Sequence, residues 1–340
     1  MSAPRTVPEL SVVVPVYDEE EVLPEFHRRA QAVLASCAPE HELIYVDDGS
    51  RDASPAILLA AAAADPRVRV LRFSRNFGHQ AAVTAGIEYA RGDAVVVIDA
   101  DLQDPPEVIP ELIAQWRAGF EVVSAVRAVR EGESAVRLVL IKIFYRLLHR
   151  ISTVDLTPDV GDFRLLDRRV ADALNRLPER NRYVRGLVRW LGFRHVEVPY
   201  RRAGRYAGAT KYPYIKLVRL ALDGITSFST VPLTLVTYLG FAVSALSVLL
   251  VAYALYGRFI IGRTPEGWTS VFVAVAFLSG IQLVAIGVLG AYVGRIFAEV
   301  KGRPLYVIAS DTAVAGAAAA PSGAALSGVA GSAAPAGRSR

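Results

Sequence analysis

Short apolar runs alternate with helical stretches over the first part of the chain. The apolar runs are rich in valine and isoleucine, each ends near proline, glycine or aspartate, and they cover residues 10–16, 42–46, 68–73 and 94–98. The helical stretches between them cover residues 20–35, 55–64 and 80–90. Strand and helix repeated in this order predict an α/β fold, with a mostly parallel sheet covered by helices. Such a sheet binds ligands at the carboxyl ends of its strands.

Two long segments without charged residues follow in the second half of the chain. They lie between Asp223 and Arg258 and between Glu266 and Arg295. Each is longer than the roughly 20 apolar residues that are needed to cross a bilayer. We therefore expect two transmembrane helices, at about 231–256 and 269–293, within a hairpin of residues 229–295. A buried hairpin in a soluble protein is the alternative, but both segments are long for core helices.

The positive charges around these segments predict their orientation. Lys211, Lys216 and Arg219 precede the first segment, Arg295, Lys301 and Arg303 follow the second, and the loop between them has Arg258 and Arg263. The excess on the outer flanks places both chain ends on the cytoplasmic side of the inner cell membrane. The first residues show no charged region followed by an apolar run, so we expect no cleavable signal peptide.

Two basic amphipathic segments are expected to lie on the membrane surface. In residues 134–151 the apolar positions recur at helical spacing, and Lys142, Arg146 and Arg150 line one face at i, i+4 and i+8. Residues 213–228 have a similar character just before the first long apolar segment. These patterns are typical of interfacial helices, although the solvated face of an ordinary helix has the same charge spacing.

The composition fits a globular domain joined to membrane segments. The 340 residues are 53% hydrophobic and 21% charged, with a net charge of +5, which is apolar for a soluble protein. We expect an N-terminal cytoplasmic domain over residues 1–212, a cytoplasmic segment over 296–309 and a disordered tail of small residues over 310–340. The single cysteine, Cys37, excludes a disulfide framework and is expected to be a buried or incidental thiol.

Carboxylates gather where three of the predicted strands end. They are Asp18 and Glu19 after the first strand, Asp47 and Asp48 after the second, and Asp99 and Asp101 after the fourth. In a parallel sheet these ends share one edge, so the charges would repel one another unless a cation or a donor-rich ligand lay among them. Asp99 and Asp101 suit a hard divalent ion, with Gln103 as a neutral oxygen ligand, and such an ion commonly bridges carboxylates to a substrate diphosphate. Asp48, beside Gly49, could accept hydrogen bonds from a base or ribose.

Several segments carry a resemblance to a known family. They are VVVPVYDEE, YVDDGSRD, LRFSRNFGHQAA, VVVIDADLQDPPE, GDFRLLDRR, ERNRYVRGLVRWLGF and RRAGRYAGATKYPYIKLVRLALDGITSFS. Together they resemble the polyprenyl-phosphate glycosyltransferases of family 2, close to dolichol-phosphate mannose synthase, over roughly residues 10–307. The resemblance implies a GT-A (Rossmann-like) catalytic domain, in which a nucleotide sugar and Mg²⁺ or Mn²⁺ meet a lipid phosphate at the membrane. It implies an inverting hexosyltransferase.

The resemblance also implies roles for individual residues. The nucleotide pocket would be lined by Pro15, Tyr17, Glu19, Val46 and Asp48, the donor would also contact Ala100, and the metal would be held by Asp99, Asp101 and Gln103, with Asp101 serving catalysis. Arg127 and Arg137 would bind the acceptor phosphate, and Arg205 would close over the donor diphosphate. The family commonly has asparagine where Asp18 stands and serine where Thr210 stands. Neither departure touches the metal ligands.

The expected chemistry does not require a protein base. A lipid phosphate is already an anion near neutral pH, so its oxygen can attack the anomeric carbon once it is positioned and the leaving group is stabilised. Asp162, in the Val-Gly-Asp-Phe-Arg segment, is the candidate base, and an orienting role is as well supported. His79 is expected to cap a helix or contact substrate rather than to titrate in the reaction.

The sugar and the base stay open at this stage. The ALDGITSFS segment and the paired apolar segments resemble the bacterial glucosyl-transferring branch and favour UDP-glucose with undecaprenyl phosphate, while GDP-mannose and modified UDP sugars remain alternatives. A processive polysaccharide synthase would have more spans and a Gln-x-x-Arg-Trp signature, which no glutamine here begins. A non-enzymatic scaffold would explain the spans but not the carboxylates. We expect no nucleic-acid partner, and the paired spans offer a surface for a homo-oligomer.

Overall fold

The computed structural model describes residues 7–127, 160–180, 182–200, 231–260 and 267–313. Both predicted amphipathic helices, Arg137 and Arg205 lie outside the described residues. So does the tail from residue 314 onward. Arg127 ends strand β5 by its backbone, but its side chain is not among those described.

The described residues form one mixed sheet of eight strands. The strands are β1 Leu10–Val16, β2 His41–Asp47, β3 Val68–Phe73, β4 Ala94–Val97, β5 Val122–Arg127, β6 Val160–Asp167, β7 His195–Tyr200 and β8 Ile308–Asp311. Their order across the sheet is β7-β5-β6-β4-β1-β2-β3-β8. The pairings among β1, β2, β3 and β4 are parallel, as is that of β5 with β7. β6 runs antiparallel to β4 and β5, and β8 runs antiparallel to β3. The predicted parallel arrangement is therefore confirmed for the first four strands, whereas the whole sheet is mixed.

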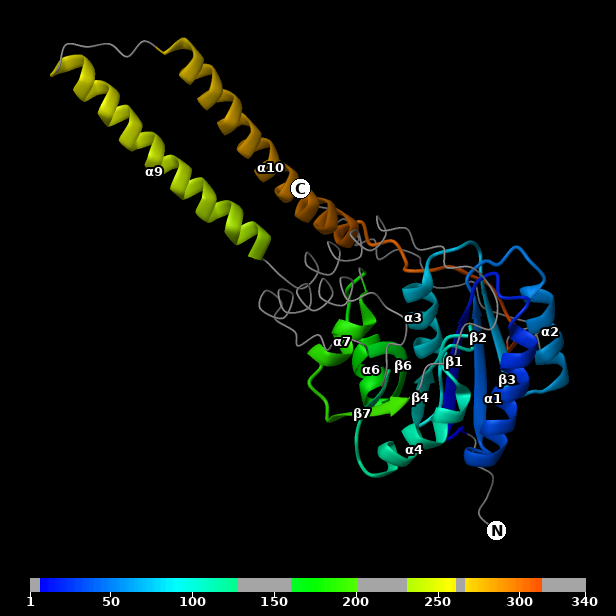
Figure 1. Cartoon of the computed structure of the whole chain (residues 1–340). Coiled ribbons are helices and arrows are strands. Elements are labelled where there is room, and N and C mark those ends of the chain that lie inside the picture. The colour runs from blue at the N-terminus through cyan, green and yellow to red at the C-terminus, as the bar shows by residue number, and fades with distance from the viewer. Residues whose placement is uncertain (1–6, 128–159, 181, 201–230, 261–266, 314–340) are drawn as a thin grey trace, which may run out of the picture.

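Helices cover both faces of this sheet (Figure 1). They are α1 Leu23–Cys37, α2 Ser54–Ala64, α3 His79–Tyr89, α4 Ile109–Arg117, α6 Arg168–Asn175 and α7 Val184–Trp190, with a 3-10 turn η1 at Pro106–Val108. Val12 and Val14 of β1 belong to the core beneath α1, α2 and α4. Val13 belongs to the core beneath α3, α6 and α7. Because both faces are covered, the parallel strands are continuous apolar runs rather than alternating ones.

Helix α3 lies directly against β1 at a glycine. A Cβ at Gly86 would come within 2.0 Å of a methyl carbon of Val13, so no larger residue fits without a shift of the helix. This close approach fixes α3, and with it His79 at the first position of that helix, relative to the central strand.

Two long helices follow the sheet domain and extend away from it (Figure 1). They are α9 Val231–Phe259 and α10 Trp268–Val300, which run antiparallel and begin within a residue of the predicted positions. Among the described side chains, Phe277–Val300 is long and apolar enough to cross a membrane, while Leu233–Leu249 is apolar but shorter. The two predicted helices are confirmed, and one of the two predicted membrane spans has a candidate in the described residues.

The end of the hairpin differs from the sequence-based prediction. Helix α10 continues past residue 295 to Val300, and the chain then adds β8 to the sheet beside β3. The disordered tail was expected from residue 310, but Ser310 and Asp311 are paired with Arg72 and Leu71. The prediction of the tail's start was therefore wrong, because edge pairing with a distant strand leaves no periodic signal in four residues.

Candidate active site

Strands β1, β2 and β4 end at the same edge of the sheet, as their parallel pairing requires. Val16 of β1 lies opposite Asp47 of β2, and the amide of Ile98, just past β4, donates to the carbonyl of Val13 at 3.0 Å. The loops that carry the predicted ligands therefore begin beside one another.

The residues predicted to line a nucleotide pocket differ in their exposure. Pro15 and Val46 are direct partners across β1 and β2, and both side chains are buried in the sheet domain. Ala100 is also buried, whereas the Tyr17 side chain is 43% exposed at the end of β1. Of these four residues, Tyr17 is therefore the one whose side chain is exposed at this edge of the sheet.

Asp18 and Glu19 fasten the loop after β1 to the loop after β2. Asp18 has a φ of +54°, in the left-handed region that asparagine and aspartate adopt more readily than other non-glycine residues. Its carboxylate accepts the backbone N–H of Arg51 at 2.8 Å, and its own N–H donates to Ser50 Oγ at 3.0 Å. The N–H of Glu19 donates to Ser54 Oγ at 3.0 Å. The aspartate in place of the family's asparagine thus suits both the backbone and the hydrogen bond.

Asp48 holds the loop between β3 and α3. Its two carboxylate oxygens accept the backbone N–H groups of Phe77 at 2.6 Å and Gly78 at 2.9 Å. Burial raises the pKa of Asp48, and these two hydrogen bonds act in the opposite direction. Gly49 has a φ of +73°, and a Cβ there would lie 2.6 Å from the backbone of Arg75. The sequence suggested that Asp48 could accept hydrogen bonds from a base or ribose. Each of its oxygens accepts one backbone N–H here and keeps a further acceptor site, so this role stays a prediction.

Asp99 and Asp101 follow β4 and keep carboxylate oxygens for a ligand. The Asp99 side chain is 34% exposed, yet its Oδ1 atom is buried and makes no hydrogen bond within the described residues. Burial, only partly offset by the nearby His79, raises the pKa of Asp99 to about 6. Asp101 Oδ1 accepts the backbone N–H of Gln103 at 3.1 Å across a turn in which Leu102 has a φ of +58°. Gln103 is 7% exposed.

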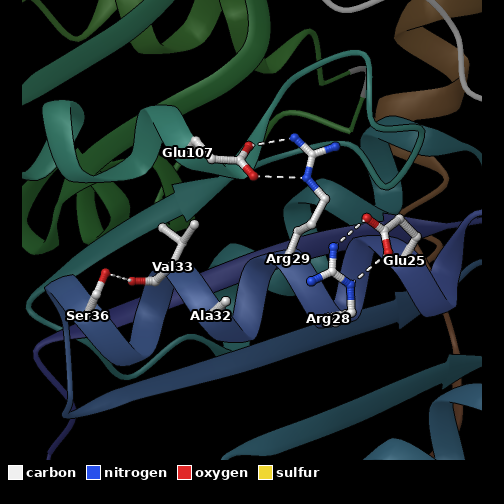
Figure 2. A pocket seen from close by; sticks show the side chains of 7 residues that line it. All are labelled: Glu25, Arg28, Arg29, Ala32, Val33, Ser36 and Glu107. Atoms are coloured by element: carbon white, nitrogen blue, oxygen red, sulfur yellow. Dashed lines mark hydrogen bonds and ion pairs between the residues drawn. The ribbon is translucent and has the colours of Figure 1, made fainter.

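The other carboxylates of this segment have partners elsewhere. Asp104 is buried and accepts a hydrogen bond from the hydroxyl of Tyr200 in β7. Glu107 forms a two-pronged pair with Arg29 of α1, at 2.9 and 2.7 Å, as Figure 2 shows. The crowded run from Asp99 to Glu107 therefore divides into two residues at the strand end and two that tie η1 and β7 into the fold.

A surface pocket of about 440 Å³ lies along α1. It is lined by Glu25, Arg28, Arg29, Ala32, Val33, Ser36 and Glu107 (Figure 2). Its charged side chains are paired with one another, Glu25 with Arg28 and Arg29 with Glu107. It contains none of the strand-end carboxylates, so we do not assign the chemistry to it.

A buried ionic cluster lies beside Asp99. Asp162 of β6 is 3% exposed and receives two hydrogen bonds from Arg185 of α7, both at 2.8 Å. His79 Nε2 lies 3.0 Å from Asp162 Oδ2 and 3.8 Å from Asp99 Oδ1. Burial raises the pKa of Asp162, but Arg185 and His79 outweigh it and hold the pKa of this carboxyl well below its usual range.

This cluster bears on the two roles considered for Asp162, as base or as orienting residue. A carboxylate that is ionised and hydrogen-bonded on both oxygens is a poor proton acceptor, so the geometry favours an orienting role. Burial lowers the pKa of the His79 imidazole, while its bond to Asp162 raises it, and the net direction is upward. Arg185 was not predicted from the sequence as a site residue. It lies in the quoted segment ERNRYVRGLVRWLGF, but nothing local to that segment pairs it with a carboxylate 23 residues earlier.

The described residues do not form a metal site from protein ligands alone. They contain no group of three histidine, cysteine or carboxylate side chains that could hold an ion. The buried Oδ1 atom of Asp99, which makes no hydrogen bond within the described residues, and the carboxylate of Asp101 nevertheless match the oxygen ligands that Mg²⁺ and Mn²⁺ prefer. An ion here would need further oxygens from a bound substrate.

Comparison with known proteins identifies the family. The sequence profile of Glycosyl transferase family 2 matches residues 11–174. The uncharacterized glycosyltransferase YkcC of Bacillus subtilis (strain 168) is 49% identical over 298 residues, which cover 88% of this chain and 92% of that protein. The chain belongs to glycosyl transferase family 2. The site at the ends of β1, β2 and β4 lies within the region that the family profile matches.

Other known proteins also match nearly the whole chain. The bactoprenol glucosyl transferase of Shigella phage SfII is 44% identical over 299 residues, which cover 88% of this chain and 97% of that protein. Among solved structures, the mannosyltransferase PcManGT from Pyrobaculum calidifontis in complex with GDP-Man and Mn²⁺ is 19% identical, covers 88% of both chains and has a TM-score of 0.42.

Replacement of Asp162 by asparagine tests its orienting role. The amide keeps the shape of the side chain but removes the charge, so we expect transfer by Asp162→Asn to fall by about 10-fold, rather than by the 10²- to 10⁴-fold expected from loss of a general base. Initial rates would be measured in detergent at a temperature at which circular dichroism shows the variant to be folded. The control is Asp172→Asn, on the exposed face of α6. A loss of 10³-fold in folded protein would reinstate Asp162 as the base.

Proposed function

We propose that the protein transfers glucose from UDP-glucose to the phosphate of a polyprenyl phosphate, with inversion at the anomeric carbon. The observation that carries the proposal is the 44% identity to a bactoprenol glucosyl transferase over 97% of that protein's length. An alignment of that extent must include α9 and α10 as well as the sheet domain. It therefore supports both the donor chemistry and a lipid acceptor.

The acceptor's own charge supports a mechanism without a protein base. A polyprenyl phosphate is an anion near neutral pH, so the enzyme needs to position its oxygen and to neutralise charge on the leaving diphosphate. Arg127 and Arg137 are proposed to bind the acceptor phosphate, and Arg205 the donor diphosphate. Asp162 holds His79 and Arg185 at the side of this site by the contacts described above.

A divalent ion fits the end of β4. Asp99 and Asp101 are proposed to hold Mg²⁺ or Mn²⁺, with Gln103 nearby, because the buried Oδ1 atom of Asp99 otherwise makes no hydrogen bond within the described residues. When bound, the ion would offset the negative charge of the leaving nucleoside diphosphate. Tyr17 offers an exposed aromatic face at the end of β1 for the base of the nucleotide.

A membrane location follows from the acceptor and from the two apolar helices. Phe277–Val300 can cross a bilayer by length and composition, and α9 is proposed to form the second span. The basic residues outside the hairpin support an orientation with the sheet domain and both chain ends in the cytoplasm. The donor is a cytoplasmic nucleotide sugar, so this orientation brings donor and lipid to the same membrane face.

Turnover of a panel of nucleotide sugars tests the donor. With undecaprenyl phosphate in detergent and Mg²⁺ or Mn²⁺ present, we expect UDP-glucose to be used at least about 10-fold faster, by kcat/KM, than UDP-galactose, UDP-N-acetylglucosamine or GDP-mannose. Product formation would be followed as labelled sugar that enters the organic phase. A preference for GDP-mannose would contradict the proposed donor while leaving lipid glycosylation intact.

Replacement of Asp101 tests the metal site. Asp101→Asn removes a charged ligand and nearly preserves its shape, so we expect loss of metal-dependent donor binding and a fall in transfer of about 10²-fold or more with the fold intact. Donor binding would be measured by calorimetry at several Mn²⁺ concentrations. The control is Glu107→Gln, on the same segment, whose 51% exposed side chain pairs with Arg29. Metal-dependent binding that matches the wild type would rule out Asp101 as a ligand.

Reporter fusions test the topology. A reporter at the C-terminus should behave as cytosolic, and one inserted before Gly267, at the start of α10, should behave as external. Alkaline phosphatase and green fluorescent protein fusions in a bacterial host give the two opposite signals. Both reporters on one side would mean that the hairpin does not span the membrane twice.

A further inference from the structure

The chain between α10 and the end of β8 binds the sheet domain at several separate points. We call residues 299–312 the strap. At its start, both carboxylate oxygens of Glu299 in the last turn of α10 accept the backbone N–H of Arg180, at 3.0 and 3.1 Å. Gly302, with a φ of +64°, then turns the chain away from the helix axis. The end of the apolar helix is therefore attached to the loop between α6 and α7.

The far end of the strap closes the edge of the sheet. β8 pairs antiparallel with β3, and the N–H of Ser74 donates to the carbonyl of Val307 at 2.9 Å. Arg69 forms a two-pronged pair with Asp311, at 3.0 and 2.6 Å, between side chains that are only 14% and 8% exposed. A bidentate, largely buried pair of this kind is stronger and more directional than a surface ion pair. The strap is thus a built part of the sheet rather than a loosely held tail.

The middle of the strap contacts β3 and α3, the two elements that flank the loop held by Asp48. The ring of Tyr306 stacks on Phe73 with centroids 5.0 Å apart and planes 10° from parallel, and its hydroxyl donates to Glu88 of α3. Phe73 in turn meets Phe77 edge-on at 5.7 Å. Phe77 is the residue whose N–H donates to Asp48. One chain of contacts therefore runs from the strap to the carboxylate that holds the β3–α3 loop.

The two attachments of the strap lie on the two segments that form the buried cluster. His79 directly follows the β3–α3 loop, and Arg185 lies shortly after the α6–α7 loop that Glu299 binds. These segments are also joined to each other, because the N–H of Val184 donates to the side chain of Gln80 at 3.1 Å. We therefore expect a shift of the strap relative to the sheet to move both partners of Asp162, His79 through the β3–α3 loop and Arg185 through the α6–α7 loop.

We propose that the strap couples the end of the membrane helix to the geometry of the active site, and that Tyr306 is a positioning residue that acts through Phe73 and Phe77 on the loop before His79. Protection of an exposed sheet edge would explain β8 alone. Edge protection requires neither the stack of Tyr306, which precedes β8, nor the link from α10 to the α6–α7 loop. The inference rests on the proposed function only for the reaction by which turnover is measured.

Variants of Tyr306 in the full-length protein test this inference. Tyr306→Ala removes the stack, so we expect kcat to fall by about 10-fold with the KM for polyprenyl phosphate changed less than about 2-fold, because misplacement of a prearranged site lowers turnover more than binding. Tyr306→Phe keeps the ring and should restore kcat to within about 3-fold of the wild type. The matched control is Val307→Ala, which trims a half-exposed neighbouring side chain and keeps the backbone bond to Ser74.

Hydrogen exchange separates failure of this inference from failure of the proposed function, since it needs no turnover. In Tyr306→Ala the amides of Phe77 and Gly78, which Asp48 binds, should exchange at least about 10-fold faster, while amides of β1 stay unchanged. Asp311→Ala, which detaches β8 from Arg69, should give the same pattern by a different route. Unchanged exchange at Phe77 and Gly78 in both variants would overturn the proposal, and so would equal kcat losses in Tyr306→Ala and Val307→Ala.

Discussion

The parallel pairing of β1 with β2 and with β4 is the constraint on which the site depends, because it brings carboxylates from three loops to one edge of the sheet. Two unit charges 4 Å apart repel by about 1 kcal/mol in water and by more beside a protein. The fold relieves most of this repulsion with neutral donors. Asp18 accepts the N–H of Arg51, and Asp48 accepts those of Phe77 and Gly78. The same hydrogen bonds join the loops to one another, so they both reduce the repulsion between the carboxylates and order the loops.

Negative charge that is not neutralised in this way collects at Asp99 and Asp101. Asp162 lies close by, but its buried carboxylate is paired with Arg185 and with His79, whose side chains are partly exposed. The buried Oδ1 atom of Asp99 makes no hydrogen bond in the described part of the chain, and this supports the ion proposed there. A glycosyltransferase needs its leaving diphosphate neutralised at one defined place. The neighbouring carboxylates of Asp18, Asp48 and Asp162 have hydrogen-bond partners, which supports the proposal of the ion at the end of β4.

The path of the chain after α10 gives the sheet domain a second link to the apolar hairpin. A helix that leaves a domain through one connection can tilt about it, whereas α10 is held to the domain through Glu299 and again through β8. A lipid acceptor must reach the site from the membrane surface, so the height of the strand ends above that surface matters for positioning its phosphate. Attachment to β3 and to the α6–α7 loop limits this freedom at the two segments beside Asp162.

Sequence patterns were enough to predict the first four strands, the helices between them and the two long apolar helices. They also predicted that carboxylates gather at one edge of the sheet. These features depend on local properties: valine-rich runs form buried strands, and parallel strands carry their end residues to a common edge. The sequence did not determine which carboxylates stay available. No pattern in the sequence indicates that Asp48 accepts the N–H groups of the loop that ends at Gly78, or that Arg185 of α7 pairs with Asp162. Strand β8 could likewise not be predicted, because Arg69 and Asp311 lie far apart in the sequence and pair only in the folded chain. Side-chain pairing across the sheet depends on distances that only tertiary packing sets, and those distances decide whether a carboxylate binds a substrate or holds the fold together.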